Sequence, residues 1–160
     1  MRAPPDKRLA RLSGGGLRLK IHRIVRLETD RLDAETASIG VMVVDDQPGF
    51  RRVARAVIHA TAGFQPVADA ASGSDALRTA DAEYPDLILM DVYMPHMDGF
   101  EATRRLTEAH PESVVVLVSV DDLEDLADEV AACGAAGFLR KRDLRPATLR
   151  GLWTSHGGVR

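Results

Sequence analysis

Five short apolar runs recur along the chain, and each is followed by a segment with helical character. The runs occupy residues 41–44, 64–70, 86–90, 113–119 and 136–139. Short apolar strands that alternate with helices predict right-handed crossovers, a parallel sheet and helices on both faces of it. In such an α/β fold the functional crevice lies at the carboxyl ends of the strands, so residues at those ends are the first candidates for a site.

Length and charge narrow the class of protein. The chain has 160 residues, 45% of them hydrophobic, which suits one packed domain, and no apolar window is long enough for a membrane helix. Its single cysteine, Cys133, cannot form an internal disulfide, which fits a reducing compartment. Residues 1–37 carry a net charge of +4 and residues 38–160 a net charge of -7, so the acidic main body argues against nucleic-acid binding.

Local signals predict where several helices begin. Pro48 suits the first position of a helix that follows the first strand. Ser72 with Asp75, and Asp98 with Glu101, have the spacing of a capping box. The first helix is predicted to bury an apolar face made of Phe50, Val53, Ala54, Val57 and Ile58.

Other residues predict ends, edges and weak points. Gly63 is expected to end the first helix, and Pro66 indicates that the second strand lies at an edge of the sheet. Residues 121–134 read as one acidic helix ended by Gly134. The last helix is short and contains Gly151, so we expect it to pack weakly.

Polar side chains collect at the predicted strand ends. Asp45 and Asp46 follow the first strand, Asp91 the third, Ser119 ends the fourth, and Lys141 follows the fifth. Taken singly, each is as well explained by a turn, a helix cap or a solvated surface. Together they indicate a site, because converging carboxylates repel one another unless a cation such as Mg²⁺ joins them. A lysine and a hydroxyl beside them suit a phosphate, so the set describes an aspartate that becomes phosphorylated next to magnesium.

At these residues the chain resembles the receiver domain of response regulators, and most of all its NarL/FixJ-type subfamily. The likeness covers residues 39–153 and includes "VVDD", "DLILMDVYMPHMDGFEA", "VVVLVS" and "GFLRK". It implies a flavodoxin-like, doubly wound sheet of five parallel strands in the order 2-1-3-4-5. Residues 1–38 would then be a basic extension and residues 154–160 a tail.

The resemblance also implies a role for each candidate residue. Asp91 would accept the phosphoryl group, and Asp45, Asp46, Asp91 and the backbone carbonyl of Tyr93 would bind Mg²⁺. Lys141 would pair with the phosphate. Ser119 would be the switch hydroxyl and Phe138 the aromatic whose rotamer follows it.

This sequence departs from the family pattern near the site. Val120 follows Ser119 where a small residue is usual, and its bulk could narrow access to the phosphoryl group. Position 138 holds Phe rather than Tyr, so the aromatic has no hydroxyl, and Arg142 replaces a common proline after Lys141.

The function that the resemblance implies is phosphoryl transfer in a cytoplasmic two-component system. The donor would be a sensor histidine kinase or a histidine phosphotransfer protein, and phosphorylation would change binding of a downstream protein target. The chain would be a signalling receiver and not a metabolic enzyme, without nucleic-acid binding by the residues present or a membrane role, and homodimer formation stays open. One alternative is a phosphorylation-independent interaction module. A second, a Mg²⁺-dependent aspartyl-phosphate phosphatase, is disfavoured by Tyr93, which stands where such enzymes usually carry a second aspartate.

Overall fold

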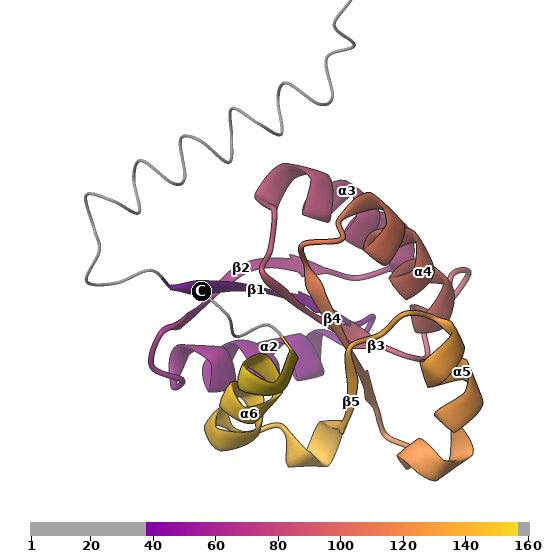
Figure 1. Ribbon diagram of the computed structural model, residues 1–160. Coiled ribbons are helices and arrows are strands. Elements are labelled where there is room, and N and C mark those ends of the chain that lie inside the picture. The colour runs from indigo at the N-terminus through magenta and orange to yellow at the C-terminus, as the bar shows by residue number, and fades with distance from the viewer. Residues whose placement is uncertain (1–37, 157–160) are drawn as a thin grey trace, which may run out of the picture. The chain divides into compact units, whose positions relative to one another are not determined.

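Five parallel strands form one sheet in the order β2-β1-β3-β4-β5 (Figure 1). The computed structural model describes residues 38–156, and the predictions for residues 1–37 and 157–160 lie outside that part. The strands are β1 (Ile39–Val44), β2 (Phe64–Ala70), β3 (Leu87–Asp91), β4 (Val114–Ser119) and β5 (Gly137–Arg140). The predicted fold class and strand order are therefore confirmed.

Helices cover both faces of the sheet (Figure 1). One face carries α2 (Pro48–His59) and α6 (Pro146–His156), and the other carries α3 (Gly73–Glu83), α4 (Gly99–Ala109) and α5 (Ala127–Ala132). Two short 3-10 helices, η2 (Leu123–Asp125) and η3 (Lys141–Asp143), follow β4 and β5. Among residues 38–156, no helix has the length and apolar character needed to span a membrane.

The central strands are buried on both faces, which explains their unbroken apolar sequences. All five residues of β3 are buried, and its four apolar side chains divide between two hydrophobic clusters, one under each layer of helices. β2 lies at the edge as Pro66 predicted, and its pairing with β1 shifts register beside Pro66 and Val41. A proline has no N–H to donate to a strand ladder, so an irregular edge is where it can be accommodated.

The helix starts follow the predicted caps, but α2 differs in two details. Ser72 accepts a hydrogen bond from the Asp75 N–H, and Asp98 accepts one from the Glu101 N–H. In α2, Val53 is 56% exposed, so the prediction that it belongs to the buried face is wrong. Gly63, at φ +83°, lies four residues beyond the end of α2 in the turn to β2 rather than at the helix terminus.

The predicted single acidic helix over residues 121–134 is wrong. The segment forms η2, a break at Leu126 and the six-residue α5, and Gly134 follows with φ +83°. Acidic residues recur four apart, as Asp121 with Asp125 and Glu124 with Asp128. Like charges at that spacing destabilise a helix, so a continuous helix is disfavoured.

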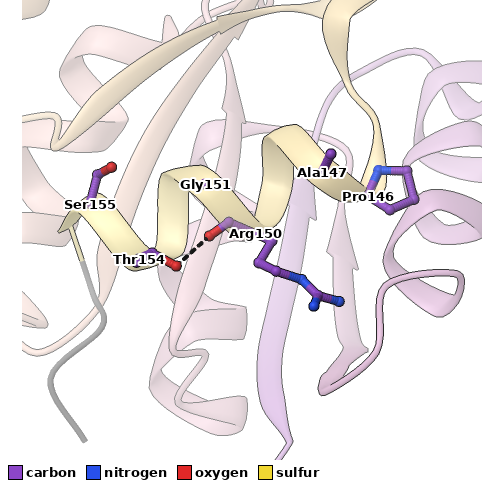
Figure 2. Close-up of a pocket in the computed structure, with 6 residues that line it drawn as sticks. All are labelled: Pro146, Ala147, Arg150, Gly151, Thr154 and Ser155. Carbon is purple, nitrogen blue, oxygen red and sulfur yellow. Dashed lines mark hydrogen bonds between the residues drawn. The ribbon is translucent and has the colours of Figure 1, made fainter.

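The final helix packs better than its glycine suggested. Leu149 is fully buried, and the half-buried Leu152 and Trp153 pack on the same cluster as α2. Gly151 lies on the outer side of α6, where a Cβ would meet nothing within 4 Å (Figure 2). Its lack of a side chain therefore removes no core contact, although Leu149 is the one fully buried residue of α6.

Candidate functional site

Three carboxylates meet at the carboxyl edge of the sheet. Asp91 is the last residue of β3, while Asp45 and Asp46 follow the last residue of β1. Because β1 and β3 are adjacent and parallel, these residues reach the same edge, and one oxygen from each lies within 4.8 Å of the others. Asp45 and Asp91 are buried, whereas Asp46 is exposed. The structure thus brings together the three aspartates that the sequence singled out.

Lys141 joins the three carboxylates from the end of β5. It follows β5 and opens η3, and its Nζ lies 2.6 Å from Asp45 Oδ2 and 3.2 Å from Asp91 Oδ1. The same nitrogen stands 4.7 Å from the centroid of the Phe50 ring on α2. A ring face attracts a cation at this distance, so Phe50 helps to hold the ammonium over the carboxylates. Sequence reasoning had treated Phe50 only as a core residue.

The pKa of the Asp91 carboxyl lies above its ordinary value. Burial and then repulsion from Asp45 raise it to about 6, although Lys141 partly offsets the rise. Burial acts to lower the pKa of Lys141, but the hydrogen bond and charge of Asp45, with the charge of Asp91, raise it overall. The ammonium is therefore charged at neutral pH, and the site holds one cation between two buried acids.

Asp45 is fixed on both of its oxygens. Oδ1 accepts a hydrogen bond from the Gln47 N–H at 2.8 Å, and Oδ2 faces Lys141. The Asp45 carbonyl accepts from Arg51 Nη1 at 2.6 Å, which ties the β1–α2 loop to the first turns of α2. Asp46 is exposed and makes no hydrogen bond or ion pair with residues 38–156, so its carboxylate can turn toward an added ion.

Gly99 positions the end of β3 through a close backbone contact. Its N–H donates to the Val92 carbonyl at 2.8 Å, and a Cβ on Gly99 would stand 2.1 Å from the Asp91 carbonyl oxygen. No side chain fits there without moving β3 or α4. The "MDG" sequence thus has a steric reason, which pattern reading alone did not supply.

Ser119 and Phe138 lie where the sequence placed them. Ser119 is fully buried at the end of β4, and its Oγ accepts from the Asp121 N–H at 3.1 Å. Phe138 is half-buried in β5 and packs against the cluster beneath α3, α4 and α5. Val120 is 69% exposed, so its side chain lies at the surface rather than in the core.

The charge and spacing of the acidic cluster fit a magnesium ion. Mg²⁺ takes oxygen ligands at ~2.0–2.1 Å, so opposite ligand oxygens stand roughly 4 Å apart. The 4.8 Å spread of the three carboxylate oxygens approaches that value, and Asp46 is free to close the difference. Among the described residues, Lys141 is the cation that contacts the two buried acids.

A second hollow on the surface lacks such chemistry. It runs along the outer side of α6, where its described lining residues are Pro146, Ala147, Arg150, Gly151, Thr154 and Ser155 (Figure 2). Arg150 is the one ionisable side chain among these residues, and none of them is acidic. The acidic cluster therefore remains the better candidate.

Comparison with known proteins gives one consistent answer. The family model described as "Response regulator receiver domain" matches residues 41–150. The response regulator GacA of Pseudomonas aeruginosa is 38% identical over 103 residues, which are 64% of this chain and 48% of that protein. The transcriptional regulatory protein DegU of Brevibacillus brevis is 35% identical over 64% of this chain and 44% of its own length. The chain thus spans about half the length of the curated relatives it matches.

Solved structures agree with this result. The receiver domain of the regulator NarL from Mycobacterium tuberculosis superposes with a TM-score of 0.64 at 29% identity, over 72% of this chain and 96% of that one. The response regulator domain of CheB from Thermotoga maritima gives a TM-score of 0.67 at 25% identity, over 77% of this chain and 99% of that one.

Proposed function

The chain belongs to the response-regulator receiver domain family of two-component systems, and on that basis we propose that Asp91 is its phosphoryl acceptor. The observation that carries the proposal is the pairing of Asp91 with a lysine and two further aspartates at one edge of the sheet. The donor is the phosphohistidine of a sensor kinase or of a phosphotransfer protein. An oxygen of the Asp91 carboxylate attacks phosphorus, the phosphorus–nitrogen bond breaks, and the imidazole nitrogen keeps the electron pair and takes up a proton.

We assign a metal site to the same cluster. Asp46, Asp45, Asp91 and the backbone carbonyl of Tyr93 would hold Mg²⁺, with Asp45 acting partly through water because Lys141 and Gln47 already occupy its oxygens. Bound Mg²⁺ supplies charge that neutralises the phosphoryl oxygens. The exposed Asp46 is the carboxylate that can bind it without breaking an existing contact.

Lys141 is assigned to the phosphoryl group. Its ammonium rests between Asp45 and Asp91, so a small displacement takes it from Asp45 to an oxygen added on Asp91. An ammonium serves such an oxygen as a point charge. The Phe50 ring contacts it from the α2 side in the resting position.

The output is a change in protein binding. Ser119 would move toward the phosphoryl group and Phe138 would turn into the vacated space, which alters the surface of α5, β5 and α6. A downstream protein target would bind that altered surface. A second copy of this chain, in a homodimer, is the other partner we propose for it. We assign the chain to the cytoplasm, as a signalling module and not a metabolic enzyme. The acidic main body gives no reason to add direct nucleic-acid binding.

The alternatives receive less support. A phosphatase of this chemistry would need a general acid at position 93, where the Tyr93 phenol instead donates to Asp121. An interaction module independent of phosphorylation would have no use for a complete acid and lysine cluster. We also propose that the receiver domain runs from residue 39 to residue 153, with residues 1–38 as an extension and residues 154–160 as a tail.

Intact mass spectrometry after incubation with phosphoramidate and Mg²⁺ tests acceptance. The full chain should gain one phosphoryl group, and omission of Mg²⁺ should abolish most of that gain. Amide hydrogen exchange on the same samples tests the switch. Altered protection in residues 119–141 would support it, and unchanged protection at full modification would favour the phosphorylation-independent module.

A further inference from the structure

Tyr93 and Asp121 join the two loops that flank Asp91. Tyr93 lies two residues after β3 and Asp121 two residues after β4. The Tyr93 phenol donates a hydrogen bond to Asp121 Oδ2 at 2.6 Å, and the Asp121 N–H donates to Ser119 Oγ at 3.1 Å. A continuous chain of contacts therefore runs from the β3–α4 loop to the hydroxyl at the end of β4.

This chain of hydrogen bonds begins at the surface, at Tyr93, and ends in the core, at Ser119. The Tyr93 side chain is 51% exposed, so burial contributes little to its position, while Ser119 is fully buried. The phenol is the donor in the hydrogen bond to Asp121, so the contact depends on the Tyr93 hydroxyl. On the β4 side, the apolar side chains of Val120 and Leu123 are exposed.

This arrangement opposes movement of Ser119. The hydroxyl can approach a phosphoryl group on Asp91 either by leaving the Asp121 N–H or by carrying the 119–121 turn with it. The first route loses the Ser119–Asp121 hydrogen bond. The second loses the Tyr93–Asp121 hydrogen bond, because Tyr93 is anchored to the other loop. Each route therefore costs one contact that the resting arrangement has.

We propose that Tyr93 is a positioning residue that acts through Asp121 to hold Ser119 in the resting arrangement and so weakens the binding of a phosphoryl group at Asp91. The inference rests on the proposed function of Asp91. The expected effect on affinity is unusual for a hydrogen bond beside a binding site, because removing the Tyr93 hydroxyl should strengthen the binding of the phosphoryl group. A residue that merely supports the structure would weaken binding when it is altered.

Beryllofluoride with Mg²⁺, a stable mimic of the phosphoryl group, provides the test on the full chain. Fluorine NMR gives its dissociation constant for the wild type and for Tyr93→Phe, which removes only the hydroxyl. A partly exposed hydrogen bond corresponds to roughly a twofold to tenfold change in an equilibrium constant, so the variant should bind that much more tightly. Equal or weaker binding by Tyr93→Phe would overturn the proposal.

Asp121 variants separate the hydrogen bond from charge. Asp121→Ala should match the gain of Tyr93→Phe, the double variant should gain no more than either single one, and Asp121→Asn should retain near-wild-type affinity because its amide oxygen still accepts. Glu124→Ala, which removes an exposed acid from the same segment, measures the effect of charge alone. If the affinity gains of the two single variants added up in the double variant, Tyr93 and Asp121 would act independently, which would contradict the proposal. Failure of the wild type to bind the mimic would instead remove the assignment of Asp91, and this inference with it.

Discussion

Lys141 Nζ stands closer to Asp45 than to Asp91, at 2.6 Å against 3.2 Å. The lysine thus occupies, before any ion binds, a position against one of the carboxylates assigned to Mg²⁺. Lysine and magnesium compete for the negative charge of Asp45, and phosphorylation gives the lysine a new partner.

Removal of the lysine should therefore separate metal binding from phosphoryl binding. We predict that Lys141→Ala binds Mg²⁺ more tightly, by roughly threefold to tenfold, because a competing charge a few ångströms away is gone. The same variant should bind beryllofluoride more weakly than the wild type. Isothermal titration measures the first constant and fluorine NMR the second. Weaker Mg²⁺ binding by Lys141→Ala would show that the lysine supports the metal site and does not compete with it.

The two adjacent aspartates should differ in their importance for the metal. Asp46→Ala should abolish measurable Mg²⁺ binding, because this exposed carboxylate is free to bind an ion directly. Asp45→Asn should weaken it less, since its oxygens already face Lys141 and the Gln47 N–H. Mg²⁺ titration of both variants decides, and unchanged affinity in Asp46→Ala would rule out the assignment.

Stability should depend on pH through Asp91. Its pKa is about 6 in the folded protein against an ordinary value of 3.8, so its protonated form stabilises the fold below about pH 4, and this contribution is lost as the pH rises through 6. Asp91→Asn lacks that titration. The free energy of unfolding of Asp91→Asn, relative to wild type, should therefore rise by about 1–3 kcal/mol between pH 4 and 7 in a chelator.

Urea unfolding at several pH values measures this difference. Asp128→Asn, at an exposed position on α5, serves as the matched control and should show no such trend. A constant difference between Asp91→Asn and wild type across the range would mean that Asp91 is not held in a site that disfavours its charge.

Gly99 should tolerate no side chain. A Cβ there would stand 2.1 Å from the Asp91 carbonyl oxygen, so Gly99→Ala should destabilise the protein by about 1–3 kcal/mol and weaken Mg²⁺ binding by displacing the end of β3. Gly49→Ala is the control, because a Cβ there meets nothing within 4 Å and alanine favours the helix. Equal stability of the two variants in urea would contradict the steric account.

The sequence predicted those parts of the site that depend on strand ends. Asp45, Asp91, Ser119 and Lys141 could be placed together because parallel strands deliver their carboxyl ends to one edge. Asp46 and Phe138 also lie where they were expected, since neighbours along a strand or loop follow from its register.

Features that depend on distances between separate elements escaped the sequence reading. The Phe50 ring beside Lys141, the Gly99 contact with the Asp91 carbonyl and the Tyr93–Asp121 hydrogen bond each join residues whose spacing follows no period. The prediction of one helix over residues 121–134 was wrong for a different reason. The segment was predicted to be one acidic helix ended by Gly134, but repulsion between carboxylates four residues apart acts against a continuous helix.

The most direct test of the account is to locate the phosphoryl group. After incubation with phosphoramidate and Mg²⁺, borohydride reduces an aspartyl phosphate to homoserine, and peptide mass spectrometry identifies the altered residue. The account predicts homoserine at position 91, and no labelling of Asp91→Asn. Homoserine at position 45 or 46, or undiminished labelling of Asp91→Asn, would contradict it.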